Sequence, residues 1–289
     1  MMKSLSGVVR VLVTLSVVAA AAVVAWQLWV YYMVEPWTRD GRVRADVVGV
    51  APDVSGLVSE VLVRDNQKVE QGDVLFRVDR ARYELAVAQA RQQVAARTAT
   101  FEQARRDEAR YQTLNEVAVS EQRREQARQA VAEAQAALKQ SQIDQELAEL
   151  NLARTDVKAA VPGVVTNFSL RPGSYVSAGV AVTALVDSES FYVVGYFEET
   201  KLGRIRIGDR AAVRLMGEAE DIAGRVESIA AGIDDREVAG TTRLLPNVNP
   251  TFSWVRLAQR VPVRIRIEDI PSGTKLIVGR TANVTVLGN

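Results

Sequence analysis

Hydrophobic and polar residues follow different patterns along the chain, and each pattern predicts a different structure. Residues 11–32 form one apolar segment, which predicts a helix long enough to cross a bilayer. Residues 47–80 and 155–188 alternate apolar and polar positions, which is typical of β-strands. Residues 81–154 repeat apolar positions at spacings of three and four, which indicates long helices. Residues 189–289 return to the strand pattern.

The N-terminal segment is predicted to be a membrane anchor. Val11 to Tyr32 contains no charged residue, and Lys3 and Arg10 precede it, so the N-terminus should stay in the cytoplasm. Its apolar core is longer than that of a cleaved signal peptide, and aromatic residues occupy the place of a small-residue cleavage site. We therefore assign residues 1–34 to a cytoplasmic N-terminus and a retained transmembrane helix. The residues chosen to represent the anchor are Val11, Trp26, Trp29 and Tyr31.

The middle segment, residues 81–154, is predicted to be an antiparallel α-helical coiled-coil hairpin. It contains neither Gly nor Pro and is rich in the helix formers Ala, Gln, Glu and Arg. A break near residues 114–121 would give two helices of about 35 residues, or roughly 50 Å each, with Ser120 as the N-cap of the second. The predicted seam consists of Tyr83, Val87, Ala90, Val94, Arg97, Phe101, Ala104 and Tyr111, and of Ala127, Ala130, Ala134, Ala137, Ser141, Ala148 and Leu152.

The two strand-rich stretches that flank this hairpin are repeats of one another. When Gly56 is aligned with Gly163, no gap is needed through Val78 and Leu185. Neither half can bury its apolar face alone, so the two halves are predicted to pack as one β sandwich, split by the hairpin. The matched positions are Val61 with Phe168, Val63 with Leu170, Asn66 with Gly173, Val69 with Val176, and Gly72 with Gly179.

Residues 189–289 are predicted to form a small antiparallel β-barrel, with residues 35–46 as a linker that leads into it. Alternation along residues 261–267 places Val and Ile on one face and Arg264 and Arg266 on the other. Four Arg residues lie in this region, namely Arg256, Arg260, Arg264 and Arg266. They either attract an anion or form a solvent-exposed face of the strands. Residues 234–254 form a long polar connection.

Composition excludes several classes of function. The 289 residues include 36 Lys and Arg and 35 Asp and Glu, so a net charge of +1 gives no argument for nucleic-acid binding. There is no His and no Cys, which excludes disulfides, thiolate nucleophiles, zinc fingers and Ser-His-Asp triads. The chain also has no phosphate-binding loop. We therefore expect no enzyme activity and no cofactor.

The order of these segments resembles that of HlyD/EmrA-type periplasmic adaptors, also called membrane fusion proteins. The two half motifs carry the resemblance, but the turn "DRARYELA" at residues 79–86 lacks the modified Lys of true biotinyl or lipoyl carriers. Three further phrases are similar to the AaeA branch of that family. They are "EPWTRDGRVRADVVGVAPDVSG" (residues 35–56), "FYVVGYFEETKL" (191–202) and "WVRLAQRVPVRIRI" (254–267).

The resemblance implies an elongated multidomain protein of mixed α and β structure, anchored by one helix in the inner membrane of a Gram-negative bacterium, with its bulk in the periplasm. It implies a homotrimer or homohexamer that joins an inner-membrane aromatic acid exporter, with a TolC-like outer-membrane channel as a further partner. The exported compounds would be aromatic carboxylic acids such as p-hydroxybenzoic acid. At the hairpin tip, the resemblance implies that Arg110, Leu114 and Ser120 contact the channel.

Other interpretations remain open at this stage. Ser120 could be only an N-cap and Leu114 only the end of the seam. The protein could serve a multidrug pump of the EmrA type or a peptide or protein exporter, or it could be an envelope tether without transport. A membrane-tethered enzyme is the alternative that the composition supports least.

Overall fold

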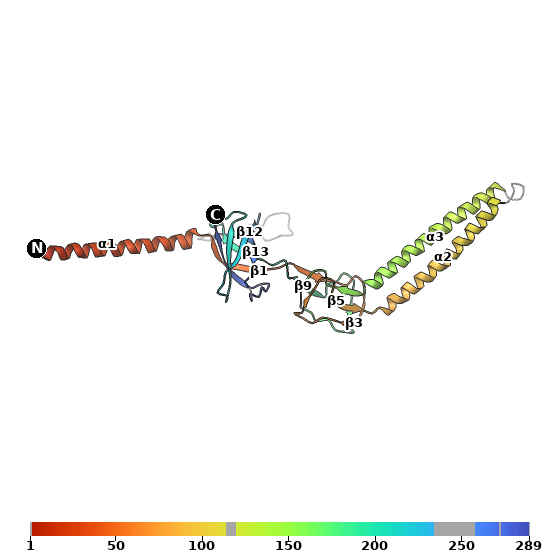
Figure 1. Cartoon of the computed structure of the whole chain (residues 1–289), viewed down its shortest axis with the longest axis horizontal. Helices are drawn as coiled ribbons and strands as arrows, with labels where there is room; N and C mark the ends of the chain where they lie inside the picture. The colour runs from red at the N-terminus through yellow and green to blue at the C-terminus, as the bar shows by residue number, and fades with distance from the viewer. Residues whose placement is uncertain (1, 114–119, 234–257, 272, 289) are drawn as a thin grey trace, which may run out of the picture. The chain divides into compact units, whose positions relative to one another are not determined.

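The computed structural model describes residues 2–113, 120–233, 258–271 and 273–288 (Figure 1). The chain divides into two compact units, Met1–Asp46 with Ser190–Asn289, and Val47–Glu189. The first unit contains the N-terminal helix and a β-barrel. The second contains a β sandwich and a helical hairpin. The predicted mixed α and β fold class is confirmed.

The N-terminal helix α1 (Met2–Trp29) continues into one π-helical segment, η1 (Val30–Val34). Within α1, Leu12–Trp29 has a mean hydropathy of 1.9 and none of it is buried by the rest of the protein. By length and composition this segment is able to cross a membrane. Trp26 and Trp29 are 70% and 60% exposed, as expected for side chains that face lipid.

The C-terminal strands close into a barrel in the order β1-β10-β13-β12-β11-β14, with every neighbouring pair antiparallel. Alternate side chains point inward, and Phe197, Leu215 and Ile265 are among those that are fully buried. The elements are β1 (Trp37–Arg44), β10 (Tyr192–Glu198), the 3₁₀ helix η2 (Glu199–Arg204), β11 (Arg210–Leu215), β12 (Ile222–Ile229), β13 (Arg260–Asp269) and β14 (Thr281–Leu287).

Strand β1 corrects one prediction, because residues 37–44 were assigned to a linker. They instead complete the barrel by pairing with β10 on one side and β14 on the other. Gly41 allows this closure, since a Cβ at that position would lie 2.6 Å from the carbonyl oxygen of Ala282. The segment that follows the anchor is therefore a structural part of the barrel, and without it the barrel would be open.

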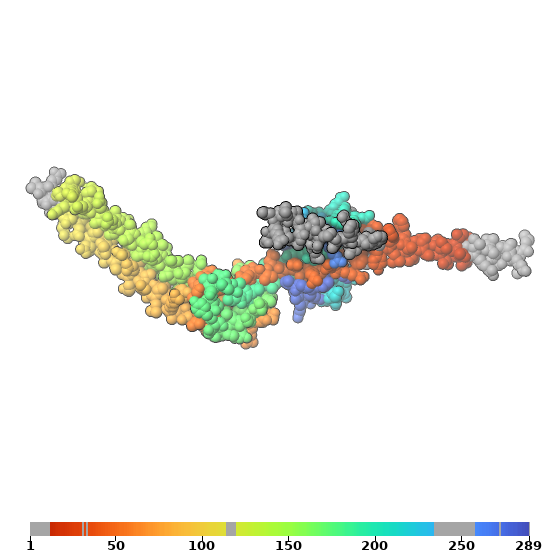
Figure 2. Space-filling model, turned by 180° about the vertical axis from the view of Figure 1, so that it is seen from behind, coloured from red at the N-terminus to blue at the C-terminus, as the bar shows by residue number. Residues whose placement is uncertain are grey.

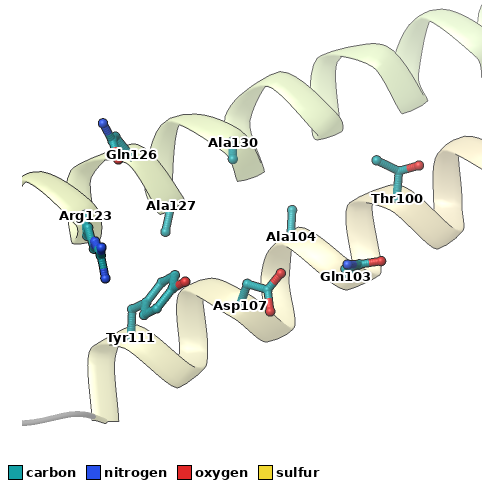
Figure 3. Close-up of a pocket in the computed structure, with 9 residues that line it drawn as sticks. All are labelled: Thr100, Gln103, Ala104, Asp107, Tyr111, Arg123, Gln126, Ala127 and Ala130. Atoms are coloured by element: carbon teal, nitrogen blue, oxygen red, sulfur yellow. The ribbon is translucent and has the colours of Figure 1, made fainter. Parts of the chain in front are cut away.

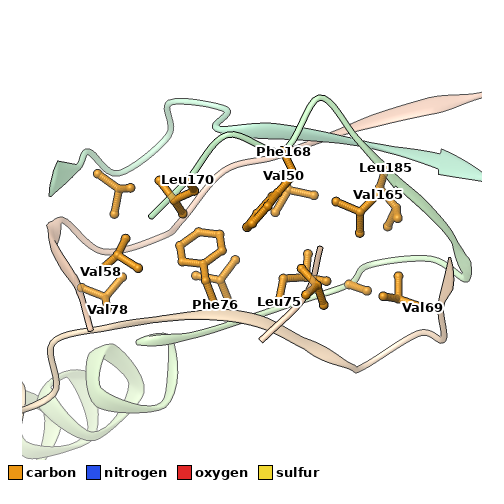
Figure 4. Close-up of a cluster of buried hydrophobic side chains, with 14 of the residues drawn as sticks. Val50, Val58, Val69, Leu75, Phe76, Val78, Val165, Phe168, Leu170 and Leu185 are labelled. Atoms are coloured by element: carbon orange, nitrogen blue, oxygen red, sulfur yellow. The ribbon is translucent and has the colours of Figure 1, made fainter. Parts of the chain in front are cut away.

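The sandwich consists of two four-stranded sheets, in the orders β2-β9-β7-β4 and β6-β5-β3-β8. Its apolar core lies between them, and Figure 4 shows Leu75 and Phe76 pointing toward Phe168 and Leu185. The strands are β2 (Val47–Val50), β3 (Gly56–Val61), β4 (Lys68–Val69), β5 (Val74–Val78), β6 (Asp156–Lys158), β7 (Gly163–Thr166), β8 (Tyr175–Val176) and β9 (Thr183–Asp187).

The two halves of the sandwich exchange their short strands. Strand β3 of the first half pairs with β8 of the second, and β7 of the second pairs with β4 of the first. The backbone hydrogen bonds between the halves occur in symmetric pairs. The Asn66 N–H donates to the Val165 carbonyl, and the equivalent Gly173 N–H donates to the Val58 carbonyl. The repeat is therefore an interlocked pair, in which each half supplies a strand to the other.

The turns of the two halves also match. Asn66 and Gly173 have φ of 61° and 88°, and Gly72 and Gly179 have φ of 93° and 77°. Only Gly, and less readily Asn, adopts this region without strain. The residues that the alignment matches therefore adopt the same left-handed conformation at equivalent positions of the two halves.

The helical hairpin consists of α2 (Ala81–Thr113) and α3 (Glu121–Ala153), each of 33 residues. Figure 2 shows the two helices side by side along the arm. The seam between them is thin, since only Val87, Ala127 and Ser141 are buried. Two predicted seam residues, Arg97 and Ala130, are exposed instead. The coiled-coil character of the pair stays a prediction.

Candidate functional site

The hairpin tip is the first candidate site, and Ser120 begins its second helix. The Ser120 backbone is extended (φ −69°, ψ 150°), and its hydroxyl accepts a hydrogen bond from the Arg123 N–H at 3.4 Å. Glu121 follows in the first turn, where a negative charge interacts favourably with the positive end of the helix dipole. The predicted N-cap role of Ser120 is therefore present in the structure, and its side chain is also exposed.

The other predicted tip residues lie at the end of α2. Arg110 pairs with Asp107 at 3.4 Å, and 67% of its side chain is exposed, so its guanidinium remains accessible. Leu114 lies outside the residues that the structure describes. Arg110 and Ser120 thus stand on the two helices on either side of residues 114–119, and contact of any of the three with a channel stays a prediction.

A groove of about 540 Å³ lies between the helices near the tip. Figure 3 shows Tyr111 of α2 and Arg123 of α3 on its two sides, with Ala104 and Ala127 directed toward each other. Small Ala side chains leave this space open, while Tyr111 and Arg123 supply polar groups. The seam prediction included Tyr111, Ala104 and Ala127 but missed Arg123, which the heptad spacing does not select.

Toward the base of the hairpin, a polar contact joins the two helices. Gln145 and Arg91 both donate hydrogen bonds to the Glu149 carboxylate, each at 3.0 Å. These bonds, with the charge of Arg91, hold the pKa of Glu149 below its usual value. The contact between Arg91 of α2 and Glu149 of α3 joins the two helices, although both side chains are largely exposed and an ion pair of this kind contributes little to stability.

The predicted anchor residues are placed on the N-terminal helical segment. Trp26 and Trp29 belong to α1 and are exposed. Val11 also belongs to α1, and Tyr31 belongs to η1, but their side chains lie outside the described structure. The anchor role of all four stays a prediction, supported by the apolar span of α1.

A second candidate site lies at the end of the barrel that the anchor enters. Trp37, the first residue of β1, contacts Tyr32 of η1 edge to face, with ring centres 6.0 Å apart. Two cations, Arg39 and Lys201, lie 5.3 Å and 5.4 Å from the centre of the Trp37 ring. Sequence reasoning missed this cluster because Lys201 is far from Trp37 along the chain, and no spacing rule connects them.

The predicted Arg cluster on β13 does not form an open anion site. Arg264 pairs with Glu227 at 2.7 Å and stacks on the Tyr192 ring at 3.7 Å. Arg266 lies 3.9 Å from Glu268, whose pKa is lowered chiefly by its hydrogen bond from Arg225. Arg260 pairs with Asp40 at 2.6 Å, and Arg256 lies outside the described residues. Arg260, Arg264 and Arg266 are therefore each close to a carboxylate on the surface of the barrel.

No catalytic or metal-binding arrangement is found in the described part of the chain. Among those residues, no group of three or more His, Cys, Asp or Glu side chains could hold a metal ion. Both pKa shifts named above belong to exposed carboxylates in ion pairs, which are structural contacts and not candidates for acid or base catalysis.

Comparison with known families divides the chain at the same place as the structure does. Residues 46–188 match the barrel-sandwich hybrid domain of RND membrane fusion proteins. Residues 190–287 match the AAEA-like beta-barrel domain. These two matches cover the sandwich with its hairpin, and all barrel strands except β1.

Individual proteins agree with this assignment. The uncharacterized protein YdhJ of Escherichia coli is 39% identical over 273 residues, which cover 94% of this chain and 96% of YdhJ. The membrane fusion protein Spr0693 of Streptococcus pneumoniae has a similar fold, with a TM-score of 0.66 and 17% identity, over 88% of this chain and 99% of that one. A MacA-MexA chimera carrying the Pseudomonas aeruginosa MexA α-hairpin gives a TM-score of 0.60 and 21% identity, over 88% and 81%.

Proposed function

Because the chain belongs to the membrane fusion protein family, the periplasmic adaptors of efflux systems, we propose that it serves a pump that exports aromatic carboxylic acids such as p-hydroxybenzoic acid. It is a membrane-anchored adaptor and not an enzyme. Its mechanism in this proposal is assembly: it connects an inner-membrane transporter of the aromatic acid exporter type to a TolC-like outer-membrane channel.

One observation carries the choice of substrate class, namely the match of residues 190–287 to the AAEA-like barrel. The barrel match points to this branch, whereas the sandwich match is to RND membrane fusion proteins. The E. coli relative is itself uncharacterized and adds no substrate. The proposal therefore depends on the barrel, and the experiment must test substrate and partner separately.

The arm supports the proposed contact with a channel. Its tip presents two exposed polar residues, Arg110 and Ser120, on separate helices. Polar, exposed residues at the end of a helical pair of roughly 50 Å suit a contact with a partner at a distance from the membrane. We propose that Arg110, Leu114 and Ser120 make that contact.

The arm also supports a homo-oligomer, which we propose to be a trimer or a hexamer. Ile143, Leu147 and Leu150 are spaced four and three residues apart, so they share one face of α3. They are 49%, 57% and 47% exposed. An apolar stripe of this kind is costly in water, and a neighbouring copy would cover it.

We propose the following domain limits. Residues 1–34 form the cytoplasmic N-terminus and a single transmembrane helix in the inner membrane of a Gram-negative bacterium, with the bulk periplasmic. Residues 47–80 and 155–188 form the lipoyl-like sandwich, 81–154 the hairpin, and 189–289 the barrel. The barrel also takes in β1, as described above.

The test of the partners is site-specific photocrosslinking of the full-length protein in intact cells. Photoreactive residues replace Arg110 and Ser120 at the tip and Arg210 at the exposed start of β11, and Lys139, exposed in the middle of α3, serves as the control. We expect an outer-membrane channel captured from the tip, a transporter captured from Arg210, and neither from Lys139. Transporter capture alone would contradict the channel contact, and capture of neither partner would contradict the adaptor proposal.

The test of the substrate is export. Deletion of the protein should raise the sensitivity of the cells to p-hydroxybenzoic acid and increase its accumulation, and the wild-type chain should reverse both. Unchanged accumulation of aromatic acids, together with increased sensitivity to unrelated drugs, would replace the aromatic acid proposal by a multidrug pump of the EmrA type.

A further inference from the structure

The cluster around Trp37 occupies the end of the barrel nearest to the anchor. Strand β1 begins there, β10 ends there at Glu198, and Glu198 is opposite Arg260 at the start of β13. Only two residues separate the end of η1 at Val34 from Trp37, so at most about 11 Å of chain joins them. Whatever binds at this end of the barrel therefore lies close to the end of the helix that is able to cross the membrane.

A pocket of about 590 Å³ is present at this end of the barrel. Its volume is within the range of sites that hold a small molecule or a headgroup. Aromatic and cationic side chains line it together, which is the combination found where proteins meet the membrane interface. The lining residues used below are Tyr32, Trp37, Arg39, Glu198, Lys201 and Arg260.

Lys201 is unusual because it is a buried cation. The residue is only 8% exposed, and its ammonium lies 3.9 Å from the nearest oxygen of Glu198, a distant ion pair. Its other contact is with the Trp37 ring at 5.4 Å. An ammonium has three donors, and the Lys201 nitrogen is not one of the fully buried polar atoms without a partner, so it remains accessible from the pocket. Lys201 therefore has unused capacity to donate to an anion in the pocket.

Arg39 adds a second cation beside the same ring. Its guanidinium lies 5.3 Å from the Trp37 ring centre, and among the described residues no carboxylate lies within ion-pair distance of it. Arg260, by contrast, is neutralised by Asp40 at 2.6 Å. With Glu198 beside Lys201 and Asp40 beside Arg260, the three cations that line the pocket outnumber its two carboxylates, so the pocket keeps an excess of one positive charge.

We propose that this pocket binds the phosphate of an anionic phospholipid headgroup, held by Arg39 and Lys201 and flanked by Trp37. Arg and Lys are the residues that bind phosphate through charge-assisted hydrogen bonds. Tyr32 and Trp37 suit the boundary between acyl chains and headgroups, because each has an apolar ring and a polar edge. The inference depends on α1 crossing a membrane and is independent of the exported substrate.

A lipid fits these observations better than a free anion does. The pocket opens beside the chain that leaves α1, where phospholipid headgroups are concentrated, so even a weak site would be occupied. Binding there would fix the height of the barrel above the bilayer. Without this contact, only the short connection between η1 and β1 would limit the height of the barrel. The lipid contact would therefore give the adaptor a defined position relative to its transporter.

The test is native mass spectrometry of the purified full-length protein in detergent, with phosphatidylglycerol or phosphatidylcholine added at equal concentration. We expect one phosphatidylglycerol to be retained per chain, at least about tenfold more strongly than phosphatidylcholine. The variants Arg39→Gln and Lys201→Met should each weaken this retention by about tenfold, the effect of losing one charge-assisted hydrogen bond. Lys201→Arg, which keeps the charge, should preserve most of it.

The matched control is Arg204→Gln, an exposed cation on η2 that does not line the pocket, and it should bind phosphatidylglycerol like the wild type. Arg39 is exposed, so its substitution leaves folding intact and keeps the test valid if Lys201→Met does not fold. Equal retention of the two lipids, or equal retention by wild type and Arg39→Gln, would overturn the proposal. Displacement of the lipid by millimolar p-hydroxybenzoate would also overturn it, in favour of a site for a small carboxylate.

Discussion

The sandwich and the hairpin belong to the same unit, yet they are stabilised in different ways. In the sandwich, Leu75, Phe76 and Leu185 are fully buried between two sheets. In the hairpin, two helices of 33 residues bury only three side chains, and two of those are Ala127 and Ser141. The sandwich therefore has a core of its own, whereas the arm depends on helix propensity and on a narrow seam.

This difference separates the two tasks of an adaptor. A large core specifies one arrangement of strands and resists change, which suits the part that carries the arm. A thin seam leaves most of each helix surface free, so that surface can be used for partners without disturbing a core. Substitutions in the sandwich should therefore mainly lower its stability, whereas substitutions in the arm should mainly weaken its contacts with partners.

The largest predicted effect contrasts two Phe residues. Phe76→Ala, at a fully buried position, should destabilise the sandwich by about 3–5 kcal/mol. Phe101→Ala, at a half-buried position where Arg105 lies 5.7 Å from the ring centre, should cost less than about 2 kcal/mol. Hydrogen exchange of β5 and of α2, measured by mass spectrometry, gives the free energy of opening for each. Equal losses of opening free energy in β5 and in α2 would contradict this difference between the sandwich and the arm.

Overpacking should show that the seam, although thin, is specific. Ser141→Leu places a larger side chain at a seam position that is only 4% exposed and does not line the groove near the tip, and should destabilise the hairpin by about 1–3 kcal/mol. Ala132→Leu, on the exposed face of α3, is the control and should change little, because Leu and Ala have similar helix propensities. Thermal unfolding of the arm followed by circular dichroism distinguishes them. If both variants behaved alike, the helices would not be packed as described.

A smaller effect is expected at Ser120, where it separates the two interpretations of this residue. Ser120→Ala removes the hydroxyl that accepts from Arg123 and should cost about 1 kcal/mol at the start of α3. Ser120→Asp keeps a cap and should restore the protection of residues 121–124 against hydrogen exchange. If Ser120→Asp restores the helix but not tip crosslinking from Arg110, the side chain has a contact role beyond capping. Recovery of both would leave the N-cap as its only role.

The smallest effect is the dependence of the arm on pH through Glu149. Hydrogen bonds from Gln145 and Arg91 lower the pKa of Glu149 below its usual value of 4.5. The contribution of this group is therefore fully present above that value and is lost as the pH falls through the lowered pKa. The stability difference between wild type and Glu149→Gln should be present at pH 7 and should shrink in acid below the lowered pKa. A difference that persists there would mean that the carboxylate charge is not its cause.

Local signals predicted the repeat of the sandwich and the two helices of the arm, but not the first strand of the barrel. Gly56 and Gly163, with Asn66 and Gly173, indicated the repeat, because the first two positions leave no room for a Cβ and the last two have positive φ. Strand β1 was missed because residues 37–44 are mostly polar, and their pairing partners lie far along the chain. Arg97 and Ala130 were placed in the seam by a strict repeat of seven, from which a straight helix of 3.6 residues per turn drifts.

For the candidate sites too, features set by neighbouring residues could be predicted, and contacts between distant residues could not. Ser120 could be predicted as an N-cap from its neighbours alone, because capping is local. The contact of Lys201 with Trp37 could not, since it depends on closure of the barrel, which brings β1 beside the end of β10. A contact between residues that only the complete fold brings together cannot be predicted from a short stretch of sequence.

The exchanged strands of the sandwich have a consequence for how the protein is made. Strand β3 needs β8, and β4 needs β7, so the first half cannot complete its sheets until the second half has been synthesised and exported. Domains that depend on such distant pairings fold slowly, and this one should remain unfolded while the chain is being translocated. The hairpin then shortens the search, because Val78 and Thr155 at its two ends are joined by a hydrogen bond of 2.9 Å. Formation of the arm would thus bring the two halves of the sandwich close together while the protein folds.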